Sequence, residues 1–284
     1  MTFSTRFAPS PTGPLHLGHA YSALTAYNMA LENNGVFHLR MDDLDQSRSR
    51  RDWENQIFED LSWLGIKWPE PVWRQSERMA KYRSALQTLW SRGLIYPCHC
   101  SRADIINAIN APQEQDPQIG PDGMIYPGTC RPQKPLKGPL PNISLRIDMR
   151  KALKCHSRGL YFTETGMGPN GETGLVKIRN MVENAGDVAL ARAQIGASYH
   201  LSIVIDDAEQ GITHIARGRD LFEATQIHVL LQRLLDLPTP VYHHHKLIRD
   251  KTGRRLAKRD DARAISKYRE EGKTPQDIRC MIGL

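Results

Sequence analysis

The chain has 284 residues, of which 40% are hydrophobic and 24% charged, as in an ordinary globular protein. No apolar run approaches the ~18 residues of a membrane span, and the first residues do not resemble a secretory signal. We therefore expect a cytoplasmic protein with no membrane partner. The formal net charge of +7 suits a polyanionic partner such as a nucleic acid, but charge alone identifies none.

Residues 1–97 alternate predicted strands and helices. Gly35 would end the first helix, and Ser76 would cap the third, which buries Met79 and Tyr82. Strands separated by helices of this length favour a parallel sheet with right-handed crossovers. The first predicted strands and helices are residues 5–8, 18–33, 36–41 and 51–64.

The pattern changes within residues 98–184, where proline and glycine are frequent and only short extended runs occur. After this segment we predict a buried strand at 199–205, a helix at 221–235 and a last helix that begins at Thr274 and Pro275. The expected fold is α/β, with a Rossmann-like parallel sheet and an inserted, partly irregular subdomain. The expected divisions are 1–97, 98–184 and 185–284.

Residues 6–19, RFAPSPTGPLHLGH, take a predicted strand through a stiff turn into a helix. The helix N-terminus offers N–H groups and a positive dipole end to phosphate. His16 and His19 share one helix face, and Gly18 would let a nucleotide lie against the backbone. A proline-rich turn with incidental histidines is the alternative interpretation.

The segment RLAKR at 255–259 resembles the second signature of class I aminoacyl-tRNA synthetases, and HLGH at 16–19 resembles the first. This resemblance implies an ATP site in which His16, Gly18, His19 and Lys258 bind the nucleotide, with Mg²⁺ accompanying it. His16, His19 and Lys258 would stabilise phosphate charge during catalysis. The loop departs from the family pattern because Arg255 replaces a lysine and Ala257 a serine.

The resemblance is more specific to the glutamate branch of class I. Residues 6–13, 39–45, 204–207 and 215–221 match its substrate segments. The implied L-glutamate site consists of Arg6, Ser10, Asp42, Tyr199 and Arg217. Arginine suits a side-chain carboxylate and an acidic residue suits the α-ammonium group. Asp42 stands where the family has glutamate, whereas Asp43 and Asp45 are expected to cap or pair locally.

Five cysteines include Cys98 and Cys100, followed by Cys130. Three thiolates leave a tetrahedral zinc one ligand short, and the residues alone leave the fourth open among His99, Tyr126, Cys155 and His156. Buried inert cysteines are the other interpretation. The pattern resembles that of the short glutamyl-queuosine tRNA(Asp) synthetases, which implies one structural Zn²⁺ held by Cys98, Cys100, Tyr126 and Cys130. We assign no role to the histidines at 243–245.

In full glutamyl-tRNA synthetases, anticodon-binding domains follow the second signature, whereas here only residues 260–284 follow. The resemblance therefore implies a monomer that activates glutamate without tRNA and transfers it to queuosine in the anticodon stem-loop of tRNA(Asp). Three alternatives remain open: a minimal synthetase that charges the tRNA 3′ end, a non-catalytic paralogue, and a class I ligase that uses free amines.

Overall fold

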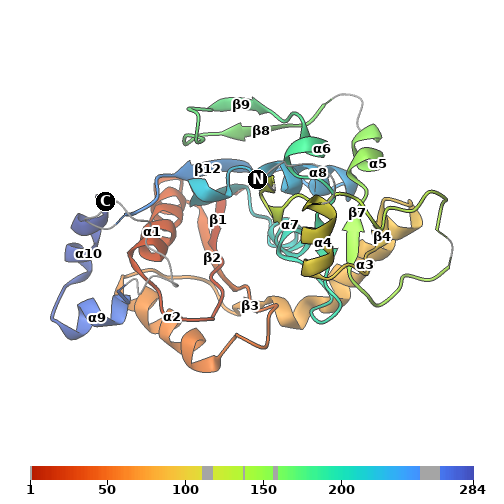
Figure 1. The fold of residues 1–284 in the computed structure, drawn as a ribbon. Coiled ribbons are helices and arrows are strands. Elements are labelled where there is room, and N and C mark those ends of the chain that lie inside the picture. Colours follow the sequence, from red (N-terminus) through yellow and green to blue (C-terminus); the bar gives the residue numbers. More distant parts are fainter. Residues whose placement is uncertain (1, 111–117, 137, 156–158, 250–262) are drawn as a thin grey trace.

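The computed structural model describes residues 2–110, 118–136, 138–155, 159–249 and 263–284. Parallel strands lie at the centre of the α/β molecule, as expected (Figure 1). One set has the order β3-β2-β1 and the other has the order β11-β12-β8-β9. Their bounds are β1 (Ser4–Phe7), β2 (Val36–Met41), β3 (Trp73–Arg74), β8 (Tyr161–Glu164), β9 (Gly174–Lys177), β11 (His214–Gly218) and β12 (Val241–His245).

The two sets of strands meet between β1 and β11. Thr213 donates its backbone N–H to the carbonyl of Ser4 at 3.0 Å, and Ser4 donates to the hydroxyl of Thr213 at 2.9 Å. β1 pairs in parallel with β2, and β11 pairs in parallel with β12. The carboxyl ends of the central strands therefore share one edge, where ligands of parallel sheets are usually bound.

Helices cover the strands. α1 packs against β1 and β11, and its buried alanines allow a close approach to the strands. α9 and α10 lie at the end of the molecule beside α1 and α2, away from the insertion (Figure 1). The helices outside the insertion are α1 (Leu17–Glu32), α2 (Arg51–Trp63), α3 (Met79–Ser91), α7 (Tyr199–Glu209), α8 (Thr225–Leu234), α9 (Ile265–Glu270) and α10 (Pro275–Ile282).

The predicted insertion contains a small antiparallel sheet of order β10-β7-β4. Two of its strands, β4 and β10, lie outside the predicted boundaries at residues 98 and 184. In addition, β8 of the insertion pairs with β12 of the central sheet. The expected insertion is thus joined to the catalytic part through strands as well as through the chain. Its elements are β4 (Ile95–Pro97), α4 (Arg102–Asn110), β5 (Ile119–Gly120), β6 (Gly123–Met124), β7 (Leu145–Ile147), α5 (Met149–Lys154), α6 (Met181–Asn184) and β10 (Ala189–Ala191).

The predicted strand at 199–205 was wrong, because these residues form most of α7. Ser198 caps the helix by accepting from the N–H of Leu201, and eight of its eleven residues are buried. A helix buried on nearly all sides has no polar face, so its sequence lacks the 3.6-residue period and resembles a buried strand.

Two helix starts were also predicted wrongly. Residues Gln75–Arg78 form a 3-10 turn, and Ser76 donates its hydroxyl to Asp43 instead of capping α3. The helix expected at 221–235 begins at Thr225, after a 3-10 turn at Arg219–Leu221. The last helix starts as predicted, with Thr274 in a capping box and Pro275 in the first turn.

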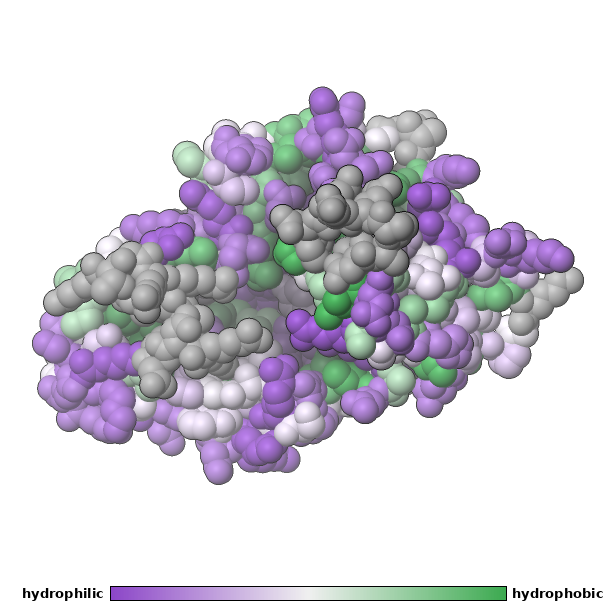
Figure 2. All heavy atoms as spheres, in the orientation of Figure 1, coloured by the Kyte–Doolittle hydropathy of each residue, from purple (hydrophilic) through white to green (hydrophobic). Residues whose placement is uncertain are grey.

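The core has one large cluster around α7, α8 and the insertion and another around α1, α2 and α10. The face in Figure 2 is largely hydrophilic and has a hollow between the part that carries α1 and the part that carries the insertion. In the described ranges, every helix is too short or too polar to span a bilayer.

Candidate functional site

A cavity of about 330 Å³ opens at the carboxyl edge of β1, β11 and β12, beside the start of α1. The structure brings six of the predicted site residues together in its lining. Other side chains in the lining come from α1 and from the segment after β11 and β12. The predicted residues are Arg6, His16, Gly18, His19, Tyr199 and Arg217, and the others include Ser22, Asp220, His245 and Lys246.

His16 and His19 cap α1 reciprocally. Nδ1 of His16 accepts from the N–H of Gly18 at 3.1 Å, and Nδ1 of His19 accepts from the N–H of His16 at 3.2 Å. Each neutral ring therefore carries its hydrogen on Nε2, and the rings lie 3.8 Å apart. Both rings lie at the positive end of a helix, a position that suits a polyphosphate.

Gly18 has a local reason to be glycine. A Cβ at this position would lie 3.0 Å from Cε1 and 3.1 Å from Nδ1 of the His16 ring. From the sequence, this glycine was expected to contact a nucleotide. In the structure, its missing side chain makes room for the histidine that caps the helix.

Arg6 lies near the end of β1, lines the cavity and has an acidic partner. Its Nε and Nη2 donate to the two carboxylate oxygens of Asp207 at 3.1 and 3.2 Å, and both residues are buried. Although burial raises the pKa of Asp207, Arg6 and Arg40 hold it below its usual value. This side-on pair occupies one edge of the Arg6 guanidinium and leaves Nη1 as the donor for another group.

Arg217 on β11 is only 4% exposed, and its described partners are uncharged groups. Nε donates to Nε2 of His244 at 3.1 Å, and Nη1 donates to Nδ1 of His228 at 3.1 Å. Nη2 donates to the hydroxyl of Thr225 at 2.8 Å and to the carbonyl of Leu221 at 3.2 Å. Within the described residues, no carboxylate lies within ion-pair distance of Arg217.

Sequence reasoning missed the residues that hold Arg217. His244 accepts from Arg217 through Nε2, so its Nδ1–H donates to the buried carboxylate of Glu164. Burial lowers the pKa of His244 to about 4 despite Glu164, which keeps the ring neutral. The run of three histidines was the available signal, but its partners on β8 and α8 are remote in sequence. The third histidine, His245, contacts the hydroxyl of Ser22 at 2.9 Å.

Two predicted glutamate ligands do not line the cavity. Asp42 is buried, accepts from Nε of Arg40 at 3.1 Å, and has a pKa raised to about 6 by burial. Ser10 lies exposed on the loop after β1. Lys258 and the remainder of the second signature lie outside the described residues. As expected, the other acidic residues of the β2 loop act locally: Asp43 accepts from Ser76, and Asp45 pairs with Arg48 at 2.6 Å.

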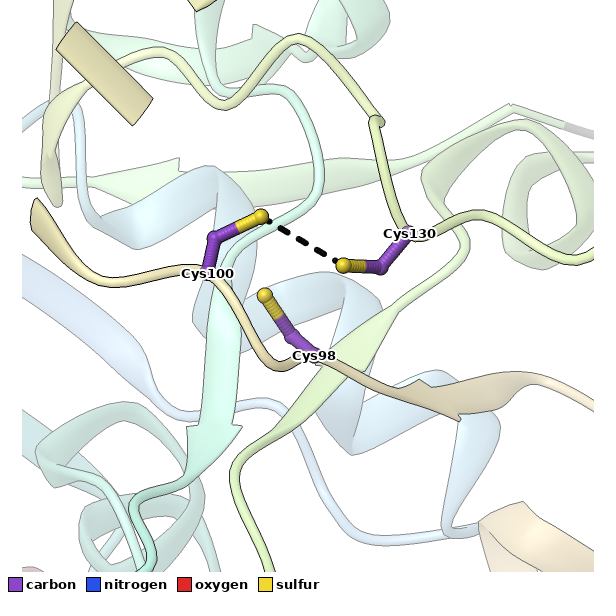
Figure 3. Close-up of side chains that lie close together, drawn as sticks. All are labelled: Cys98, Cys100 and Cys130. Carbon is purple, nitrogen blue, oxygen red and sulfur yellow. Dashed lines mark hydrogen bonds between the residues drawn. The ribbon is translucent and has the colours of Figure 1, made fainter. Parts of the chain in front are cut away.

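A second candidate site lies in the insertion, where the side chains of Cys98, Cys100 and Cys130 point toward one another (Figure 3). Their sulfur atoms lie within 4.8 Å of each other. The hydroxyl of Tyr126 lies 3.6 Å from Sγ of Cys98 and 3.4 Å from Sγ of Cys100. The four side chains predicted as metal ligands therefore form one cluster.

The donor set fits zinc. Tetrahedral coordination with Zn–S bonds of about 2.3 Å requires ligand atoms roughly 3.8 Å apart, close to the spacing observed here. Three thiolates and a phenolate would outweigh the charge of the ion. Arg146 supplies positive charge beside them, since its Nε lies 3.3 Å from Sγ of Cys98 and its guanidinium 4.0 Å from the Tyr126 ring centre.

Comparisons with known proteins agree with this geometry. Residues 2–122 and 172–284 match the family model for the catalytic domain of class I tRNA synthetases (E and Q). A glutamyl-Q tRNA(Asp) synthetase from Rhodobacter capsulatus is 57% identical over 99% of this chain and 99% of its own length. The chain belongs to the glutamyl-Q tRNA(Asp) synthetase family. It is a ligase-type enzyme, and the activity of this family is glutamate-related tRNA modification.

A more distant relative supports the same family, and solved structures share the fold. The glutamyl-Q tRNA(Asp) synthetase from Geobacter sulfurreducens is 38% identical over 93% of this chain and 78% of its own length. A glutamate tRNA ligase from Elizabethkingia meningosepticum, solved with its amino acid, aligns with a TM-score of 0.76 and 25% identity. The alignment covers all of this chain but only 61% of that ligase. A methionyl-tRNA synthetase from Mycobacterium tuberculosis, at 11% identity and a TM-score of 0.53, shares the fold.

Proposed function

We propose that this enzyme activates L-glutamate with ATP and transfers it to the queuosine base of tRNA(Asp). In the first step, an oxygen of the glutamate α-carboxylate attacks the α-phosphorus of ATP, and pyrophosphate leaves. In the second, a hydroxyl of the queuosine cyclopentenediol attacks the acyl carbon, an ester forms, and AMP leaves. The two relatives from Rhodobacter and Geobacter are glutamyl-Q tRNA(Asp) synthetases, which supports glutamate and tRNA(Asp) as substrates.

The buried charge of Arg217 is the observation that carries the choice of glutamate. A buried cation whose neighbours are neutral is costly unless a ligand pairs with it. A side-chain carboxylate would supply that charge, and Arg6 could add a second contact through Nη1. Glutamine would leave the Arg217 charge unpaired in the cavity, so it should be activated poorly.

The arrangement at the start of α1 suits ATP. His16 and His19 would hold phosphate oxygens through Nε2–H, and Lys258 would stabilise the charge that develops as pyrophosphate departs. Mg²⁺ would accompany the phosphates. In this proposal Tyr199 packs beside the amino acid, while Asp42 and Ser10 reach it only if the loop after β1 and the end of β2 adjust.

The cysteine cluster would hold one zinc ion with a structural role. Cys98, Cys100, Cys130 and Tyr126 join the segment after β4 to the loop before β7, a part of the chain with little regular structure. Such an ion would stabilise the insertion and would not contact substrate.

The acceptor is tested with labelled glutamate, ATP and purified tRNA(Asp) from queuosine-containing and queuosine-deficient cells. We expect an alkali-labile label on the queuosine-containing tRNA and on its isolated anticodon stem-loop. Removing the 3′ terminal adenosine should leave this labelling intact. Equal labelling of both tRNAs, or loss of label with the terminal adenosine, would refute transfer to queuosine.

A minimal glutamyl-tRNA synthetase is the second candidate, favoured by the structural match to the Elizabethkingia ligase. Both functions need the same glutamate and ATP pocket, so activation assays do not separate them. The acceptor experiment separates the two functions, because only a glutamyl-tRNA synthetase requires the 3′ adenosine of the tRNA.

A further inference from the structure

The Arg217 side chain is linked to the insertion by two hydrogen bonds through buried histidines and by a contact between the second histidine and Asp122. Arg217 donates to Nδ1 of His228 at 3.1 Å, and Nε2 of His228 lies 3.1 Å from Nδ1 of His200. Nε2 of His200 then lies 3.5 Å from Oδ1 of Asp122. The two histidines belong to α8 and α7, whereas Asp122 lies in the turn between β5 and β6 of the insertion.

The geometry fixes where each hydrogen lies. An arginine has no acceptor, so Nδ1 of His228 must accept, and a neutral ring then carries its hydrogen on Nε2. That hydrogen is donated to Nδ1 of His200, whose own hydrogen must lie on Nε2, facing Asp122. The donors therefore run in one direction, from Arg217 through His228 and His200 to Asp122.

Only the far end of this chain reaches solvent. His228 and His200 are buried, whereas the side chain of Asp122 is 27% exposed. Burial lowers the pKa of His228 well below its usual value, and the neighbouring Arg217 lowers it further, which agrees with a neutral ring. A protonated His228 would carry a hydrogen on Nδ1 and would repel Arg217.

We propose that His228, His200 and Asp122 are positioning residues that set the orientation of Arg217 and so determine selection of glutamate. The inference rests on the proposed function, because Arg217 is taken to bind the substrate carboxylate. On the opposite side, His244 and Glu164 hold Nε of the same guanidinium. Arg217 is thus held between two histidines, and the Asp122 branch ties its orientation to the insertion.

The hydrogen positions are tested without any activity assay. Protein labelled with ¹⁵N in its histidine rings is measured by NMR at pH 7, and His228→Asn and His200→Asn identify the two signals. We expect both rings to be neutral with the hydrogen on Nε2. A hydrogen on Nδ1 of either ring, or a doubly protonated ring, would overturn the chain.

The effect on selection is tested by glutamate-dependent pyrophosphate exchange. His228→Leu should raise the KM for glutamate about 10-fold or more, since it removes the acceptor of Arg217, while the KM for ATP changes little. His228→Asn should recover much of this loss, because its side-chain oxygen can replace Nδ1. His214→Leu is the matched control, since His214 stacks on Phe3 and does not line the cavity.

Asp122 gives a milder pair of variants if His228→Leu does not fold. Asp122→Ala should raise the KM for glutamate about 3-fold, and Asp122→Asn should not, because an amide oxygen still accepts from His200. Unchanged KM in His228→Leu and Asp122→Ala, with active wild-type enzyme, would overturn the inference. Absence of exchange in the wild type, both with and without tRNA(Asp), would instead refute the proposed function and leave the NMR result standing.

Discussion

Arg217 combines near-complete burial with four hydrogen bonds to uncharged atoms. Because a guanidinium has five N–H groups, these bonds leave one, on Nη1. A two-pronged grip on a carboxylate by Arg217 alone therefore does not fit this arrangement. One hydrogen bond from Nη1 of Arg217 and another from Nη1 of Arg6 could together bind the substrate carboxylate, whose negative charge would balance that of Arg217.

Replacing Arg217 with glutamine should remove the positive charge that selects glutamate. We expect kcat/KM for glutamate to fall by about 2–4 kcal/mol in transition-state stabilisation, with discrimination against glutamine largely lost. Pyrophosphate exchange with each amino acid measures both effects. Arg219→Gln serves as the control, because Arg219 contacts the carbonyl of Met167 and does not line the cavity. Unchanged glutamate activation would transfer the role to Arg6 or another residue.

At the scale of elements, the loops that carry the cysteine cluster depend on few backbone hydrogen bonds. Loss of a thiolate should therefore destabilise the insertion more than it affects the distant cavity. Cys98→Ser and Cys130→Ser should reduce bound zinc from one ion per chain and lower Tm, with little change in the KM for glutamate. Cys155→Ser is the matched control, since Cys155 is exposed directly after α5 and outside the cluster. Folded, active protein without metal in elemental analysis would exclude the zinc site.

Where α2 faces α9, the carboxylate of Asp60 is buried with few groups to stabilise its negative charge. Asp60 is fully buried, and neither of its oxygens has a hydrogen bond within the described part of the chain. Among the described residues, its cationic neighbour is Arg269, whose Nη2 lies 3.9 Å from Oδ1 of Asp60. Burial raises the pKa of Asp60 to about 6, so the folded protein keeps the proton on this carboxyl up to a higher pH than the unfolded chain does.

The stability contribution of neutral Asp60 is complete below pH ~4 and is lost as the pH rises through about 6. Asp60→Asn stays neutral, so it should raise the free energy of unfolding at pH 7.5 by about 1–2 kcal/mol. The advantage should vanish toward pH 4. Urea unfolding at both pH values measures this difference. Equal or lower stability of Asp60→Asn at pH 7.5 would contradict the argument.

At the scale of the whole molecule, the chain's own hydrogen bonds hold the cavity residues in place. Arg6, Arg217 and the two histidines at the start of α1 have hydrogen-bond partners in the described protein. We therefore expect glutamate-dependent pyrophosphate exchange with ATP and Mg²⁺ alone. Lys258→Ala should reduce it about 10²-fold or more through loss of one charge contact in the transition state. Strict dependence on tRNA would contradict this expectation.

Contacts close in sequence were predictable. The motif at 16–19 forms a helix start because its histidines cap their own backbone, and Thr274 with Pro275 starts α10 for the same local reason. Cys98, Cys100, Tyr126 and Cys130 were grouped from their pattern and from family resemblance, and the structure brings them together.

Tertiary structure alone decided the contacts across the sheet and between helices. Arg6 pairs with Asp207, 201 residues away, and Arg217 is held by His228 and His244 from two other elements. Nothing in the local pattern of these residues encodes such partners, because they depend on which elements pack together. For α7 the same holds: burial on nearly every side removed the periodicity that would have marked it as a helix.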